Sequence, residues 1–98
     1  MPLVEGLNTH RITSSSAEIS WNEFPQWLAL ESLELKCYES DTGKSTIVEN
    51  IEKKETGHSL ENLKAGTNYT VRMRPKAYKK YDTMFGMWNT GVNFTTKG

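Results

Sequence analysis

The chain has one cysteine and three prolines among its 98 residues. Because Cys37 has no second cysteine to pair with, an internal disulfide and a cysteine-based metal cluster are both excluded. An apolar run long enough to cross a bilayer and a charged-then-apolar N-terminal signal are also missing, so we expect a soluble piece without direct membrane insertion. Twelve basic residues balance twelve acidic ones. No overall field therefore attracts nucleic acid, and a protein is the expected partner.

Sequence motifs for catalysis are missing as well. We find no Gly-rich phosphate loop and no nucleophile motif. His10 and His58 are far apart, and neither stands in a metal-ligand or Ser/Asp arrangement. Cys37 falls on the inward parity of an expected strand, which indicates a buried, inert thiol. The sequence therefore predicts a domain that is not an enzyme and that holds no cofactor or metal.

Alternating apolar and polar residues dominate the chain, with turn signals about every ten residues. A chain of this length can form one hydrophobic core but not two. We predict an all-β fold, a seven-stranded Greek-key β-sandwich of the immunoglobulin-like type, formed as a single domain by residues 1–98. The expected strands are residues 2–12, 17–21, 30–38, 46–51, a fifth beginning near His58, 69–74 and 92–96, with Pro75 limiting the sixth strand and a long segment over 76–87.

The most informative stretch is residues 59–74, which read as strand, corner and strand. A Tyr just after such a corner can bury its ring and direct its hydroxyl to backbone groups of the turn. Leu63, Gly66 and Tyr69 stand at the spacing of a fibronectin type III domain, which the chain resembles, with Ala65 where that family usually has Pro. The resemblance covers essentially the whole chain and implies that Trp21 ends the second strand at the centre of the core. The expected core residues are Trp21, Leu35, Leu63, Tyr69 and Val71.

Aromatic, Met and Lys residues gather in two loops, one after the second strand and one before the last. In a sandwich of this topology the two loops emerge at the same end, and their composition is typical of protein interfaces. An alternative is that several of the rings fold back into the core. The expected contact residues are Phe24, Trp27, Tyr78, Lys80, Tyr81 and Phe85.

Residues 85–89 read FGMWN and precede the last expected strand. This segment resembles a degenerate Trp-Ser-x-Trp-Ser box of the membrane-proximal domain of class I cytokine receptors, and residues 69–74 resemble the strand that precedes the box there. The resemblance implies a cation–π ladder in which Arg72 and Arg74 stack against the rings of Phe85 and Trp88.

The segment departs from that box at three positions. Phe85 stands in place of the first Trp, and Gly86 and Asn89 stand in place of the two Ser residues. Strict alternation back from Val92 turns Trp88 inward, so that only an irregular segment would let the ring face the arginines.

Two N-glycosylation sequons begin at Asn68 and Asn93. A chain with this content of Asn, Ser and Thr is expected to contain about this number of sequons by chance. Each Asn nevertheless lies on the outward parity of its strand, where a glycan can be accommodated.

Together these features predict a non-catalytic protein-binding or spacer module of a cell-surface receptor, similar to cytokine receptors and located in the extracellular part of a plasma-membrane protein. The expected partners are a protein ligand or receptor subunit and neighbouring domains of the same chain. The alternative is a structural repeat of an adhesion molecule, a receptor phosphatase or an intracellular scaffold.

Overall fold

A computed structural model describes residues 3–24, 30–78 and 83–98, except for the side chains of residues 30, 46, 77, 78 and 83–85. The regular elements in these ranges are strands, and the ranges contain no helix that is long and apolar enough to cross a membrane. The strands are β1 (Asn8–His10), β2 (Ala17–Ser20), β3 (Leu30–Glu39), β4 (Ser45–Glu52), β5 (Gly57–Leu60), β6 (Asn68–Tyr78), β7 (Thr83–Phe85) and β8 (Val92–Thr95).

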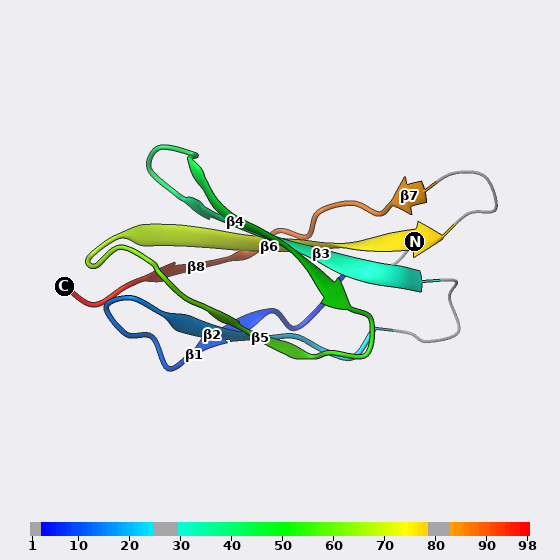
Figure 1. Cartoon of the computed structure of the whole chain (residues 1–98), viewed down its shortest axis with the longest axis horizontal. Coiled ribbons are helices and arrows are strands. Elements are labelled where there is room, and N and C mark those ends of the chain that lie inside the picture. The colour runs from blue at the N-terminus through cyan, green and yellow to red at the C-terminus, as the bar shows by residue number, and fades with distance from the viewer. Residues whose placement is uncertain (1–2, 25–29, 79–82) are drawn as a thin grey trace.

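The strands form two layers (Figure 1). One sheet has the order β1-β2-β5, and the other has the order β4-β3-β6-β7 with β8 also paired to β6. β7 and β8 pair with different halves of β6, so together they act as one interrupted edge strand. The predicted all-β sandwich of seven strands is therefore confirmed.

The core lies between the inward faces of the two sheets. β3 and β6 run antiparallel and present buried residues at every second position, so that Leu35 lies opposite Met73 and Cys37 opposite Val71. Trp21, directly after β2, is 4% exposed, and its indole Nε1 donates a hydrogen bond of 3.0 Å to the carbonyl of Glu55. The other buried apolar residues are Val4, Ala17, Ile19, Phe24, Leu33, Ile51, Leu60, Leu63, Tyr69 and Phe94.

Tyr69 forms a tyrosine corner at the start of β6. Its side chain is 1% exposed, and its ring stacks on Phe94 with centroids 5.6 Å apart. Its hydroxyl oxygen accepts a hydrogen bond of 2.8 Å from the backbone N–H of Lys64. Gly66 turns the chain between them with a φ of +58°, a conformation that favours glycine. The Tyr therefore joins the corner to the core.

Replacing Tyr69 with Phe should lower the free energy of unfolding by about 1–3 kcal/mol, because the half-buried Lys64 N–H loses its acceptor while the ring stays in place. Urea unfolding of the two proteins measures the difference. Tyr38→Phe is the matched control, since the Tyr38 hydroxyl forms no hydrogen bond with the described residues. An equal effect of the two substitutions would contradict the structural role of the corner.

β6 is longer than the sequence predicted. The expectation that it ends at Arg74 is wrong, because β6 continues through Pro75 to Tyr78. Met73 and Pro75 face the edge occupied by residues 86–91, where Met73 pairs with Asn89 and the Pro75 carbonyl accepts a hydrogen bond from Gly86. This segment is not a strand, so the N–H that Pro lacks is not needed there.

Two other expected elements differ in extent. The segment over residues 76–87 contains a hairpin formed by the end of β6 and β7, so the prediction of one long connection is wrong. The first strand is shorter than expected, since β1 covers only Asn8–His10. Val4 is nevertheless 3% exposed, so the residues before β1 still contribute to the core.

Candidate protein-binding face

The outer face of the five-stranded sheet carries a row of charged and aromatic side chains. Because Leu33, Leu35 and Cys37 point into the core, the residues between them on β3 point outward. The register with β6 sets three outward pairs, which are Glu34 with Arg74, Lys36 with Arg72, and Tyr38 with Thr70.

Asn89 fixes the irregular segment between β7 and β8. It is 6% exposed, its backbone N–H donates to the Met73 carbonyl at 2.9 Å, and its side-chain Oδ1 accepts from the Met73 N–H at 3.0 Å. Its Nδ2 donates to the Val4 carbonyl at 3.2 Å. The side chain therefore satisfies buried backbone groups that a regular strand would otherwise pair.

This irregularity turns Trp88 outward. Strict alternation from Val92 would have placed its ring in the core, but residues 86–91 are not in a strand and Asn89 is the inward residue. Gly91 then returns the chain to β8 with a φ of +82°, and a Cβ there would lie 2.5 Å from the Val71 carbonyl oxygen. Only glycine fits this position without movement of the backbone.

Trp88 contacts two cations. The Cζ of Arg74 is 4.3 Å from the centroid of the Trp88 ring, and the Nζ of Lys36 is 4.6 Å from it. Lys36 also lies 5.6 Å from the centroid of Tyr38. The Arg74 guanidinium donates through Nε and Nη2 to one oxygen of Glu34, at 3.1 and 2.8 Å. Each cation–π contact is worth about 0.5–2 kcal/mol.

The ladder differs in composition from the one that the resemblance implied. Arg74 and Trp88 contact each other, but in the described residues Arg72 makes no such contact, and Lys36 of β3 takes the second place. Reasoning from the sequence missed Lys36 because it comes from a different strand. The alternation of β3 in the sequence shows that Lys36 faces outward, but the sequence does not give the β3–β6 register that places Lys36 beside Arg72. The Phe85 side chain lies outside the described set.

The predicted loop contacts have different outcomes. Phe24 is 3% exposed and belongs to the core, so its prediction as a surface contact is corrected in favour of the folded-back alternative. Trp27, Lys80 and Tyr81 lie outside the described residues. The backbones of Tyr78 and Phe85 lie in the β6–β7 hairpin, and nothing in the structure describes their side chains.

The two sequons lie side by side on β6 and β8, and they are hydrogen-bonded crosswise. Thr95 of the second sequon donates to Oδ1 of Asn68, and Thr70 of the first donates to Oδ1 of Asn93 at 2.7 Å. Both Asn residues are exposed. In the described part of the chain the side-chain amides are bonded only through their oxygens, so neither amide nitrogen, the atom that would carry a glycan, is engaged in a hydrogen bond there.

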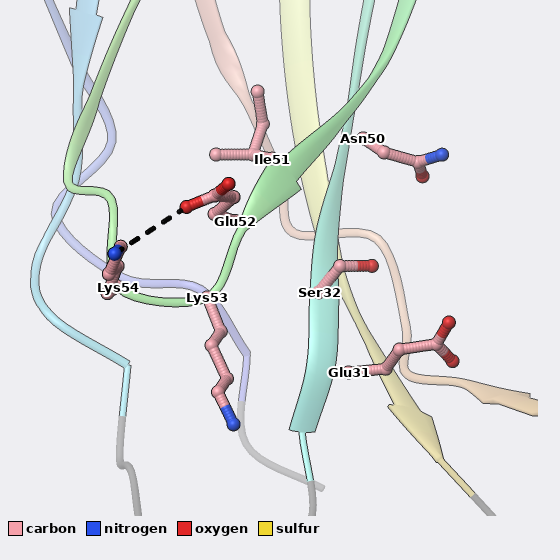
Figure 2. Close-up of a pocket in the computed structure, with 7 residues that line it drawn as sticks. All are labelled: Glu31, Ser32, Asn50, Ile51, Glu52, Lys53 and Lys54. Carbon is pink, nitrogen blue, oxygen red and sulfur yellow. Dashed lines mark ion pairs between the residues drawn. The ribbon is translucent and has the colours of Figure 1, made fainter.

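A hollow of about 400 Å³ lies beside the β3–β4 pair and is drawn in Figure 2. Asn50 and Glu31 extend to one side of the strands in this view, whereas Ile51 and Glu52 extend to the other. Lys54 is 3.9 Å from the Glu52 carboxylate. The polar groups therefore do not converge on a common point. Among the described residues no group of three His, Cys, Asp or Glu side chains is placed to hold a metal ion.

Cys37 is buried in the core, and this burial raises the pKa of its thiol to about 12. The unfolded chain therefore loses this proton at a lower pH than the folded chain does. The contribution of the thiol to stability is present below its ordinary pKa and is lost as the pH rises toward about 12.

The stability advantage of the natural chain over a Cys37→Ala variant should consequently shrink in alkaline solution. Urea unfolding of both proteins at neutral and alkaline pH measures that difference. A difference that stays constant with pH would show that the thiol ionises equally in the folded and unfolded chains.

Comparison with known proteins agrees with the sandwich and its tyrosine corner. The model of the Fibronectin type III domain family matches residues 2–85, and the chain belongs to this family. Domains of this family are generally non-catalytic binding or spacer modules and are typical of receptor and adhesion proteins.

One relative is Ephrin type-A receptor 7 of Gallus gallus, which is 36% identical over 73 residues. The match covers 72% of this chain but only 7% of that receptor. The chain thus spans a small part of the relative's length.

Solved structures show the same fold. A computer-based redesign of a β-sandwich protein has a TM-score of 0.81 at 18% identity, over 99% of this chain and 96% of that one. The chicken CNTN1 FN1–FN3 domains have a TM-score of 0.81 at 16% identity, over 100% of this chain and 31% of that one. At these identities the likeness concerns the fold alone.

Proposed function

We propose that this chain is a non-catalytic, protein-binding module in the extracellular part of a cell-surface receptor. The observation that carries the proposal is the 36% identity to a receptor, Ephrin type-A receptor 7. The sequons support an extracellular location, because Asn68 and Asn93 are both exposed and their amide nitrogens form no hydrogen bond with the described residues.

The binding surface in this proposal is the outer face around Trp88 together with the neighbouring β6–β7 hairpin. Trp88 and Lys36 supply an aromatic ring and a cation, a combination enriched at protein interfaces. The other proposed contact residues are those expected from the sequence, which are Trp27, Tyr78, Lys80, Tyr81 and Phe85.

A cytokine-receptor-like subtype is the finer form of this proposal. The stacking of Arg74 on Trp88, at 4.3 Å, supports it, since the resemblance implied a guanidinium from the sixth strand against a Trp before the last strand. Among the described side chains the likeness consists of one cation and one ring, because Lys36 rather than Arg72 makes the second contact with Trp88.

Glycan mapping tests the extracellular location. The full-length protein is purified from its native cells, and peptides covering the sequons are analysed by mass spectrometry before and after treatment with N-glycosidase. We expect a glycan on Asn68 or Asn93. The variants Asn68→Gln and Asn93→Gln serve as controls, each removing the glycan of its own sequon only. Bare asparagines in the natural protein would instead favour an intracellular interaction module.

A further inference from the structure

Lys36 and Arg72 form a pair of like charges at the centre of the outer face. They lie directly opposite each other in the register of β3 and β6. The neighbouring cations on β6 both have carboxylate partners, because Arg74 lies 2.8 Å from Glu34 and Lys76 lies 3.8 Å from Glu31. Within residues 3–24, 30–78 and 83–98, neither Lys36 nor Arg72 forms an ion pair. The pair is therefore a local excess of positive charge on a neutral chain.

This arrangement works against stability. Like charges placed directly opposite each other weaken a pair of strands. The Nε of Arg72 is also buried and finds no hydrogen-bond acceptor in the described residues, which carries a desolvation cost. The cation–π contact of Lys36 with Trp88 offsets part of this cost, but the charge of Arg72 is unpaired in the described residues. A role outside the fold is the simplest reason for that charge.

The Lys36 ammonium and the stem of Arg72 have contacts that position them before any ligand arrives. The Lys36 ammonium lies 4.6 Å from the centroid of the Trp88 ring and 5.6 Å from that of Tyr38. The aliphatic part of the Arg72 side chain packs against Gly91, where an added Cβ would lie 2.7 Å from the Arg72 Cγ. A ligand would therefore bind without first ordering long, flexible side chains, which is a saving in conformational entropy.

An apolar side chain borders the pair, and another is exposed beside Trp88 in the chain. Val48 lies opposite Lys36 on the other side, in β4, and is 63% exposed. Met87, next to Trp88 in the chain, is 77% exposed. Exposed apolar groups beside cations and a Trp ring are typical of protein–protein interfaces, whereas a sulfated sugar has few apolar groups to bury against them.

We propose that an acidic segment of a partner protein docks on this face, with a carboxylate held between Lys36 and Arg72 and with an apolar contact to Val48. This inference rests on the protein-binding part of the proposed function. It does not depend on glycan occupancy. Bare asparagines would contradict the extracellular location without affecting the docking site, and a failure of peptide binding would contradict the docking site without affecting the location.

A binding titration tests the proposal. The ¹⁵N-labelled chain is titrated with a capped hexaglutamate peptide, and chemical shifts are followed by NMR at low salt and at about 0.15 M salt, where screening acts beyond roughly 8 Å. We expect shifts centred on Lys36, Arg72 and Trp88, with weaker binding at the higher salt. A capped hexaglutamine peptide should cause none.

Arg72→Gln should weaken hexaglutamate binding about tenfold, as expected for the loss of one charge-assisted contact. Its melting temperature should stay the same or rise, because the substitution removes the like-charge pair. Arg11→Gln is the matched control, since Arg11 is 82% exposed and lies next to the other sheet. It should leave binding unchanged.

Three results would overturn the proposal. These are an absence of hexaglutamate shifts, equal weakening by Arg72→Gln and Arg11→Gln, and a preference of the same residues for a heparin-derived oligosaccharide. The last would assign the face to a sulfated glycan rather than to a protein.

Discussion

Replacing Trp21 with alanine should lower the free energy of unfolding by about 3–5 kcal/mol, the range for truncating a buried aromatic side chain. Trp21 is 4% exposed in the core, and its indole also supplies the hydrogen bond to the Glu55 carbonyl. A domain of this kind has a total stability of about 5–15 kcal/mol, so the loss should remove a large share of it.

Urea unfolding, followed by circular dichroism, measures this loss from the shift of the midpoint at constant slope. Trp88→Ala is the matched control, because the same ring is removed from the half-exposed outer face. It should cost clearly less than Trp21→Ala. A loss at Trp21 no larger than the loss at Trp88 would contradict the assignment of Trp21 to the centre of the core.

The second large effect is expected at Asn89. Asn89→Ala should cost about 2–4 kcal/mol, because the buried N–H of Met73 and the carbonyl of Val4 both lose their partner. The substitution should also release Trp88 from its position over Arg74, since Asn89 anchors the segment that turns the ring outward.

Two measurements follow this change. Denaturant unfolding gives the loss of stability, and the side-chain NMR signal of the Arg74 Nε–H reports whether the Trp88 ring still lies over it. Thr90→Ala, at an exposed neighbouring position, is the control and should change neither. An effect of Asn89→Ala no greater than that of Thr90→Ala would show that the amide does not hold the segment.

The fold class could be predicted because its signals are local. Alternation in β3 and β6 is strict. The tyrosine corner is also local, because the Tyr69 hydroxyl accepts its hydrogen bond from the N–H of Lys64, a few residues earlier in the chain. The continuation of β6 through Pro75 could not be predicted in the same way. Whether a proline interrupts a strand depends on which neighbour its missing N–H faces, and that is a property of the assembled sheet.

The candidate site was harder to predict because its contacts are not local. Trp88 meets Lys36 only through the register of β3 and β6, and alternation alone would have turned the ring inward. The buried amide of Asn89 decided the outcome, and no short motif marks such a residue. Phe24 was misplaced for a related reason, since an apolar residue in a loop has the same sequence signature whether it contacts a partner or folds into the core.

Surface labelling of intact native cells tests most directly whether this domain is an extracellular receptor module. Cells that produce the full-length protein are treated with a membrane-impermeant, lysine-reactive reagent, and the modified peptides are identified by mass spectrometry. Lys54 is a suitable reporter, because its side chain is 79% exposed. We predict modification of Lys54 in intact cells, at a level that permeabilisation does not raise. Modification only after permeabilisation, as for a cytosolic control protein, would contradict the proposal.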